Sequence, residues 1–147
     1  MKNLVCICLV LIAGITSVQA QSSADTLQIR KACLDYVEGF FTQDSIRLKN
    51  AMHPELVKRI VGDRKADNKL FTIGVKELVS YLKPENKIKN NNPKEPFQAE
   101  IIIYDISMDI AIAKIATNKM PEFFDYVQLG KVKDEWKIIN VLWALNK

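Results

Sequence analysis

The spacing of apolar residues predicts that helices come first in this chain. From Asp25 to Phe41 the apolar side chains recur at the interval of one buried helical face, at Ile29, Cys33, Tyr36, Val37 and Phe40. Asp44 is a natural N-cap for a short second helix, which we expect to end at His53-Pro54. A third helix is predicted up to Leu82 by the apolar positions Val75, Leu78, Val79 and Leu82.

The second half of the chain alternates in the manner of strands. One strand is expected at Leu56–Val61, before the third helix, and a charged, Asn- and Pro-rich loop covers Lys83–Pro96. Four further strands follow, at Phe97–Ile106, Ile110–Ala116, Phe123–Val132 and Trp136–Leu145. Their short connections predict antiparallel hairpins. The pattern indicates an α+β domain with three helices packed on a curved, mostly antiparallel sheet, and the two apolar terminal strands at its centre.

The last strand carries two predictions about its faces. Regular alternation directs Trp136, Ile138, Asn140 and Leu142 toward the helices. The other face then presents Ile139, Val141 and Trp143. An outward apolar row with a tryptophan is typical of an interface, so we expect a homodimer through the sheet.

The N-terminus has the features of a secretory signal peptide. A lysine follows Met1, no charge occurs from Leu4 to Ile15, and small residues precede Gln21. The apolar run is too short to span a bilayer, which takes about 20 residues. We therefore expect cleavage after Ala20, a secreted or periplasmic location without stable membrane insertion, and a single domain at residues 21–147. The cleaved chain keeps Cys33 as its one cysteine, so no internal disulfide can form.

Charge and histidine content exclude several functions. The 21 basic and 17 acidic residues are interspersed without a basic stripe, which gives no support for nucleic-acid binding. His53 is the single histidine, so neither a His/Cys metal cluster nor a Ser-His-Asp arrangement is indicated. No cofactor or metal is expected.

Two sequence motifs resemble those of a known protein family. The sequence "MHPE" at Met52 to Glu55 and "FFDYVQLGKVKDEWKIINVLW" at residues 123–143, in this order of elements, resemble the putative lumazine-binding branch of the nuclear transport factor 2-like, or SnoaL-like, superfamily. The resemblance implies a cone-shaped domain in exported bacterial proteins. Dehydratases, isomerases, cyclases, binding domains and dimerisation modules share this fold, so the fold alone does not set the function.

Four residues are candidates for a ligand site inside the cone. Asn140 is a polar residue on a face predicted to be buried, where it needs a partner or a ligand. Tyr36 and Tyr104 offer hydroxyl groups at the ends of apolar rings. His53 could form an acid–base pair with Glu55, although it could equally close the second helix. We expect an apolar cavity with its mouth near His53.

Three functions remain open from the sequence. The first is binding of a small, mostly apolar molecule in the cone, without catalysis. The second is a cofactor-free lyase or isomerase that works by acid–base chemistry, for which Asp105 and Asp125 are available although strand carboxylates are usually solvated. The third is a dimerisation or partner-binding domain whose cone is filled by its own side chains. An open cavity favours the first two functions.

Overall fold

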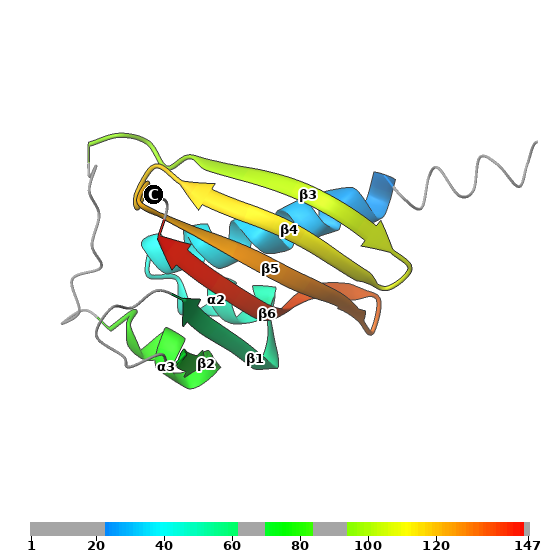
Figure 1. Ribbon diagram of the computed structural model, residues 1–147, viewed down its shortest axis with the longest axis horizontal. Coiled ribbons are helices and arrows are strands. Elements are labelled where there is room, and N and C mark those ends of the chain that lie inside the picture. Colours follow the sequence, from blue (N-terminus) through cyan, green and yellow to red (C-terminus); the bar gives the residue numbers. More distant parts are fainter. Residues whose placement is uncertain (1–22, 62–69, 84–93, 146–147) are drawn as a thin grey trace, which may run out of the picture.

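The computed structural model describes residues 23–61, 70–83 and 94–145 (Figure 1). The predicted signal peptide at residues 1–20 lies outside these described residues, as does most of the predicted loop at Lys83–Pro96.

Three helices occur in the described part of the chain, as predicted. Residues 23–41 are helical, α2 spans Ser45–Ala51 and α3 spans Val75–Ser80. The Asp44 carboxylate accepts hydrogen bonds from the backbone N–H groups of Ile46 and Arg47, at 3.1 and 2.9 Å. Asp44 therefore caps α2, which confirms the predicted start of this helix.

The described strands form one six-stranded sheet in the order β2-β1-β6-β5-β4-β3. Their bounds are β1 Met52–Val61, β2 Phe71–Gly74, β3 Ala99–Ser107, β4 Ile110–Thr117, β5 Phe123–Val132 and β6 Glu135–Leu145. The β1–β6 pair is parallel and the other pairs are antiparallel. The two terminal strands are central, as predicted. The first strand begins at Met52 and runs through His53-Pro54, and the short strand β2 was not predicted.

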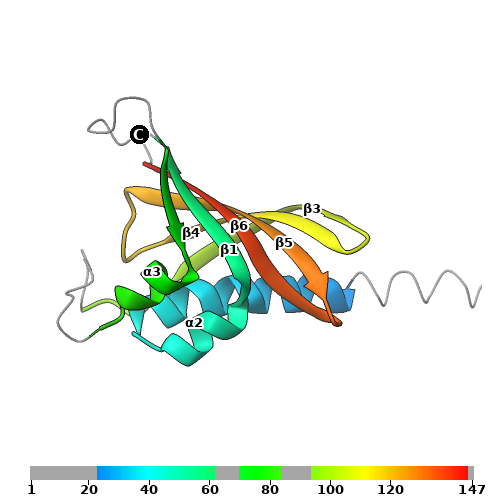
Figure 2. The ribbon, with the colours of Figure 1, turned by 90° about the horizontal axis from the view of Figure 1, so that it is seen from below.

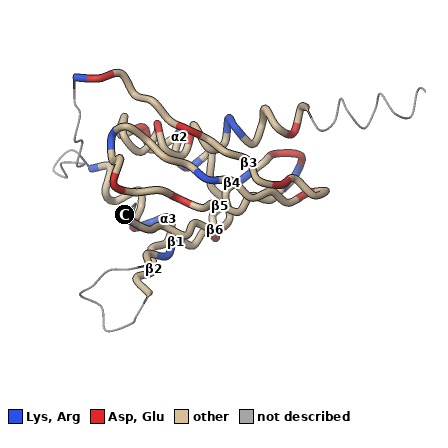
Figure 3. The backbone as a smooth tube through the Cα atoms, turned by 45° about the horizontal axis from the view of Figure 1, so that its top comes forward, with Lys and Arg blue, Asp and Glu red and all other residues tan. Residues whose placement is uncertain are grey.

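The helices pack on one face of the curved sheet (Figure 2). The core between these layers contains fully buried residues from the N-terminal helix, α2 and four strands, including Ile29, Cys33, Leu48, Leu56, Ile115, Val127, Leu129 and Ile138. This arrangement confirms the predicted α+β cone. The sign of the charged residues changes repeatedly along the described chain (Figure 3), which agrees with the absence of a basic stripe in the sequence.

A β-bulge interrupts the last strand. Leu129 of β5 pairs with Ile138, but the preceding Gln128 pairs with Asn140, so Ile139 is an extra residue in β6. An extra residue exchanges the two faces of the strand beyond it.

The bulge makes part of the predicted facing of β6 wrong. Val141 is 2% exposed and Trp143 lines the interior, whereas the sequence placed both outside. Conversely, Leu142 is 45% exposed and the Asn140 side chain bonds on the outer face, whereas both were predicted to face the helices. The predicted outward row of Ile139, Val141 and Trp143 therefore does not form.

Candidate functional site

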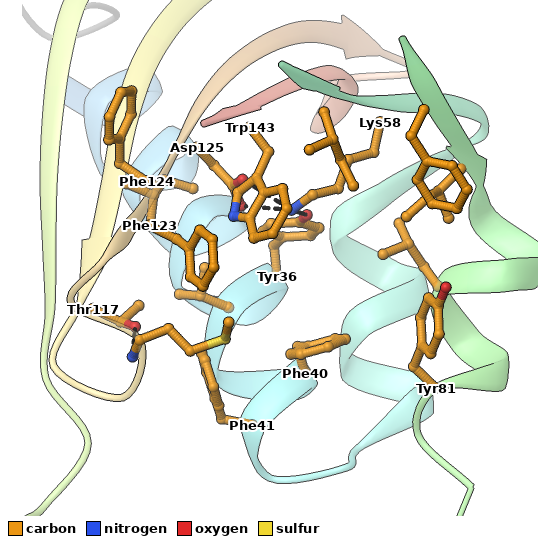
Figure 4. A pocket seen from close by; sticks show the side chains of 17 residues that line it. Tyr36, Phe40, Phe41, Lys58, Tyr81, Thr117, Phe123, Phe124, Asp125 and Trp143 are labelled. Atoms are coloured by element: carbon orange, nitrogen blue, oxygen red, sulfur yellow. Dashed lines mark hydrogen bonds and ion pairs between the residues drawn. The ribbon is translucent and has the colours of Figure 1, made fainter. Parts of the chain in front are cut away.

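A cavity of about 620 Å³ lies between the N-terminal helix and the inner face of the sheet (Figure 4). Its wall is mostly aromatic and aliphatic and is formed by Tyr36, Val37, Phe40, Phe41, Lys58, Ile60, Phe71, Ile73, Leu78, Tyr81, Ile115, Thr117, Met120, Phe123, Phe124, Asp125 and Trp143. Among these residues Phe71 and Tyr81 are the large apolar side chains most exposed to solvent, at 48% and 41%. Phe71 lies in β2 and Tyr81 follows the last residue of α3. A volume of this size suits a small molecule.

The polar groups of the cavity gather around one ammonium group. Lys58 Nζ lies 2.8 and 3.0 Å from the two carboxylate oxygens of Asp125. The same nitrogen lies 3.1 Å from the hydroxyl oxygen of Tyr36. The side chains of Lys58 and Asp125 are only 12% and 11% exposed, so this is a largely buried ion pair with a phenol attached to it. Figure 4 shows the three side chains converging, with Trp143 beside them.

The sheet register places these groups together. Asp125 on β5 pairs with Trp143 on β6, and Trp143 in turn pairs with Ile60 on β1. Lys58 precedes Ile60 by two residues and therefore shares its inward face. Tyr36 reaches the same point from the N-terminal helix, whose buried stripe includes it. Residues distant in sequence thus meet at one point of the inner surface.

Aromatic rings surround the ammonium group on two sides. Lys58 Nζ lies 5.6 Å from the centre of the Tyr36 ring and 5.4 Å from the centre of the Trp143 ring. Both distances are within the range of cation–π attraction. The other neighbour of Trp143 is Phe123, with ring centres 4.2 Å apart and planes inclined by 23°. Stacked aromatic rings at the cavity wall form a flat surface suited to a planar ligand.

The surroundings fix the protonation states of Lys58 and Tyr36. Burial alone would lower the pKa of Lys58, but the charge of Asp125 and the contact with Tyr36 outweigh it and hold this pKa above its usual range. Burial, with the charge of Asp125 added, raises the pKa of Tyr36 above its usual range, against the opposing effect of Lys58. Near neutral pH the site therefore contains an ammonium and a protonated phenol. Neither group is a general base.

One of the four predicted site residues lies in the cavity wall and the other three do not. Tyr36 lines the cavity. His53 is not in its wall, and His53 Nδ1 accepts a hydrogen bond of 3.2 Å from the backbone N–H of Glu55. Tyr104 is 54% exposed on the outer face of the sheet, with its ring centre 5.9 Å from that of Tyr126. The remaining candidate is Asn140.

Asn140 lies on the outer face because of the β6 bulge. Its amide Nδ2 donates to Gln128 Oε1 at 3.0 Å, so the partner that this side chain requires is a neighbouring amide. The structure thus brings Tyr36 to the cavity and leaves His53, Tyr104 and Asn140 outside its wall. His53, where the sequence analysis expected the cavity mouth, is not among the lining residues.

Lys58 and Trp143, which meet at the polar end of the cavity, were not among the predicted site residues, and Asp125 was named only as an available acid for the catalytic alternative. The only hint in the sequence is that Lys58 and Asp125 alternate with apolar residues, and it becomes informative once the strand registers put both on the inward face. Two opposite charges on one inward face then indicate a buried pair.

Neither a metal site nor a membrane span is found in the described residues. Within residues 23–61, 70–83 and 94–145, no group of three or more His, Cys, Asp or Glu side chains could hold a metal ion. Among the helices in these ranges, none is long and apolar enough to cross a membrane.

The three helices on a curved, mostly antiparallel sheet have the cone-shaped fold of nuclear transport factor 2-like proteins. A model of the family described as "Putative lumazine-binding" matches residues 24–144, and the chain belongs to this family. No curated protein sequence matches the chain.

Solved structures with similar folds include proteins of different descriptions. A nuclear transport factor 2-like protein of unknown function from Shewanella baltica has a TM-score of 0.65 and 22% identity, covering 85% of this chain and 96% of its own. A ketosteroid isomerase-like protein from Erwinia carotovora has a TM-score of 0.55 and 17% identity, and the match covers 81% of this chain and 94% of that protein. A hexachlorocyclohexane dehydrochlorinase of LinA type 3 from Novosphingobium barchaimii has a TM-score of 0.62 and 10% identity, and the match covers 88% of this chain and 91% of that protein. At these identities the likeness concerns the fold.

Proposed function

We propose that this protein binds a small, flat, mostly apolar molecule in the cavity between the N-terminal helix and the sheet. The observation that carries the proposal is a cavity of about 620 Å³ whose apolar wall contains one group of converging polar side chains. Ligand pockets combine an apolar body with a few such directional groups. An open cavity of this kind does not fit a cone filled by its own side chains.

Trp143 provides a direct test because its ring lines the cavity and faces Lys58. Lumazine, the flat bicyclic compound in the family description, and 2-naphthol are suitable probes. Titration of either probe is expected to change tryptophan fluorescence saturably. In Trp143→Phe the change should disappear while calorimetry still detects binding, since Trp136 is buried outside the cavity wall.

Two variants distinguish cavity binding from surface adsorption. Ile60→Phe adds volume to the cavity wall and should weaken binding, whereas Leu142→Ala changes the outer face and should not. Absence of binding for both probes, or equal weakening by both variants, would contradict the proposal.

Acid–base catalysis is a second candidate, favoured by the Asp125 carboxylate in the cavity wall. The carboxylate would take a proton from carbon while the Tyr36 hydroxyl and the Lys58 ammonium stabilise the resulting enolate. The ion pair at 2.8 Å opposes this role, because the carboxylate must act while bonded to an ammonium. Deuterium incorporation into a cyclic ketone probe, lost in Asp125→Asn, would support catalysis; no incorporation would leave binding alone.

We also propose that the domain is a homodimer, formed through the outer face of the sheet. This face exposes a group of large apolar side chains, namely Ile102, Tyr104, Ile112, Tyr126 and Leu142, each exposed by 39% to 54%. Their neighbours across the strands include Lys114, which pairs with both Ile102 and Tyr126. A single apolar face suits a self-complementary contact.

Sedimentation velocity tests this contact. Leu142→Glu should convert a dimer into a monomer, whereas Ile46→Glu, at an apolar position that is 72% exposed on α2, should leave the dimer intact. A wild-type monomer at micromolar concentration would overturn the dimer proposal.

Export of the chain is proposed from its N-terminal sequence. Cleavage after Ala20 would leave Gln21 as the first residue. Mass spectrometry of protein recovered from the bacterial envelope or the medium should find this N-terminus. Recovery of a folded product that retains Met1 would contradict cleavage.

A further inference from the structure

We propose that the Lys58–Asp125 pair makes the cavity select neutral ligands that carry a hydrogen-bond donor, and reject ligands of similar shape with a net charge. This inference rests on the proposed ligand binding and specifies the chemical class of the ligand. It assigns a specificity role to two residues on β1 and β5.

The charge balance of the cavity is the first argument. Of the residues that form its wall, Lys58 is the cation and Asp125 is the anion, and the other lining side chains are apolar or uncharged. The charged atoms of the pair lie 2.8 Å apart, so a ligand meets a dipole with no net charge. An ionic ligand would bring an uncompensated charge into a mostly apolar site, which is costly.

Competition within the pair is the second argument. A carboxylate ligand that approaches Lys58 also approaches Asp125, because both Asp125 oxygens lie within 3.0 Å of Lys58 Nζ. An ammonium ligand that approaches Asp125 meets Lys58 in the same way. Like charges brought together at a site weaken binding strongly, so either ion must first separate the pair.

Hydrogen-bond capacity specifies the neutral group. The three N–H groups of an ammonium are directed here to Asp125 and Tyr36, whereas a carboxylate has about four acceptor positions. Asp125 therefore keeps one acceptor position after Lys58 and the Tyr36 hydroxyl are bound. In the described part of the chain every buried side-chain nitrogen and oxygen has a partner, so no orphaned charge in the cavity requires an ionic ligand. A hydroxyl or ring N–H directed at Asp125 fits this arrangement.

The test uses four probes with one bicyclic body: naphthalene, 2-naphthol, 2-naphthoate and 2-naphthylmethylammonium. Near neutral pH the wild-type protein should bind 2-naphthol at least about tenfold more tightly than either ion. It should also prefer 2-naphthol to naphthalene, which has the same body without a donor. This comparison requires no variant.

Variants then reverse the preference. Lys58→Met leaves Asp125 unpaired and should shift the ratio of affinities toward the ammonium probe by about tenfold or more. Asp125→Asn leaves Lys58 unpaired and should shift the ratio toward 2-naphthoate. Lys31→Met, which removes a lysine that is 76% exposed and absent from the cavity wall, should change no ratio.

Each result has a defined meaning. Wild-type protein that binds either ion as tightly as 2-naphthol overturns the inference, even if both single variants fail to fold. If the single variants fold but the ratio of affinities for the two ionic probes does not shift, the inference is also overturned. If naphthalene binds as tightly as 2-naphthol, the hydrogen-bond donor of the ligand has no role. Failure of all four probes and of lumazine to bind removes the proposed function itself.

Discussion

Removing one member of the Lys58–Asp125 pair is expected to destabilise the fold, whereas removing both is not. Asp125→Leu leaves the ammonium without a carboxylate in a site where both side chains are almost nine-tenths buried. Breaking a buried ion pair on one side typically costs about 3–5 kcal/mol of unfolding free energy. Lys58→Met should cost a similar amount, because it strands the carboxylate. In Lys58→Met/Asp125→Leu no charge remains, and the double variant should lie within about 1–2 kcal/mol of wild type.

Urea unfolding followed by circular dichroism measures these free energies without interference from changes at Trp143. The slope against denaturant should stay constant across the variants, which shows that the same surface unfolds. Lys31→Met is the matched control: it removes the same functional group from a partner, Asp35, but at a position that is 76% exposed. Its effect should stay below about 1 kcal/mol.

The double-mutant cycle gives the refutation. If the two single changes add in the double variant, Lys58 and Asp125 do not act as a pair. If each single change costs less than about 1 kcal/mol, water reaches the pair and replaces the lost partner. Either result would also weaken the charge argument for ligand selection.

Three further changes test other parts of the fold. Asp44→Ala should cost about 1 kcal/mol of unfolding free energy, measured in urea, through the loss of the α2 cap. Hydrogen bonds from Trp136 and, to a smaller extent, Lys131 lower the pKa of Asp25 in the folded protein. The stability that this carboxylate contributes is present above its unfolded pKa of about 3.9 and should be lost as the pH falls through the folded pKa. In Asp25→Asn, the free energy of unfolding should depend less on pH in this range. Deleting Ile139 should remove the bulge and leave Trp143 facing inward, because Trp136 and Trp143 are then an even number of positions apart; acrylamide quenching should stay at the wild-type level, and increased quenching would contradict the assignment of Ile139 as the extra residue.

The sequence predicted those features that depend on local spacing. The helical stripe from Ile29 to Phe40, the cap at Asp44 and the central position of the last two strands follow from periods of 3.6 and 2 and from side-chain chemistry within a few residues. Tyr36 lies in the cavity wall for the same reason, because it belongs to the predicted buried stripe.

Features that depend on contacts between distant residues could not be predicted in this way. Lys58 and Asp125 are 67 residues apart, and each alone resembles a solvated strand residue. Their burial becomes evident only when the registers of β1, β5 and β6 are known. The placement of Asn140 failed for another reason, since the alternation rule assumes a strand without an inserted residue.

The bulge explains how one strand serves both the core and the cavity. Trp136 and Trp143 are seven residues apart, an odd separation that would place them on opposite faces of a regular strand. With Ile139 inserted, both point toward the helices. Trp136 then donates to Asp25 at 2.9 Å and fixes the N-terminal helix to the sheet, while Trp143 lies over Lys58 at the far end of the same strand. Bulges redirect side chains beside functional sites. Here the redirected side chain is the aromatic surface of the proposed ligand site, held on a strand whose other end anchors the helix that supplies Tyr36.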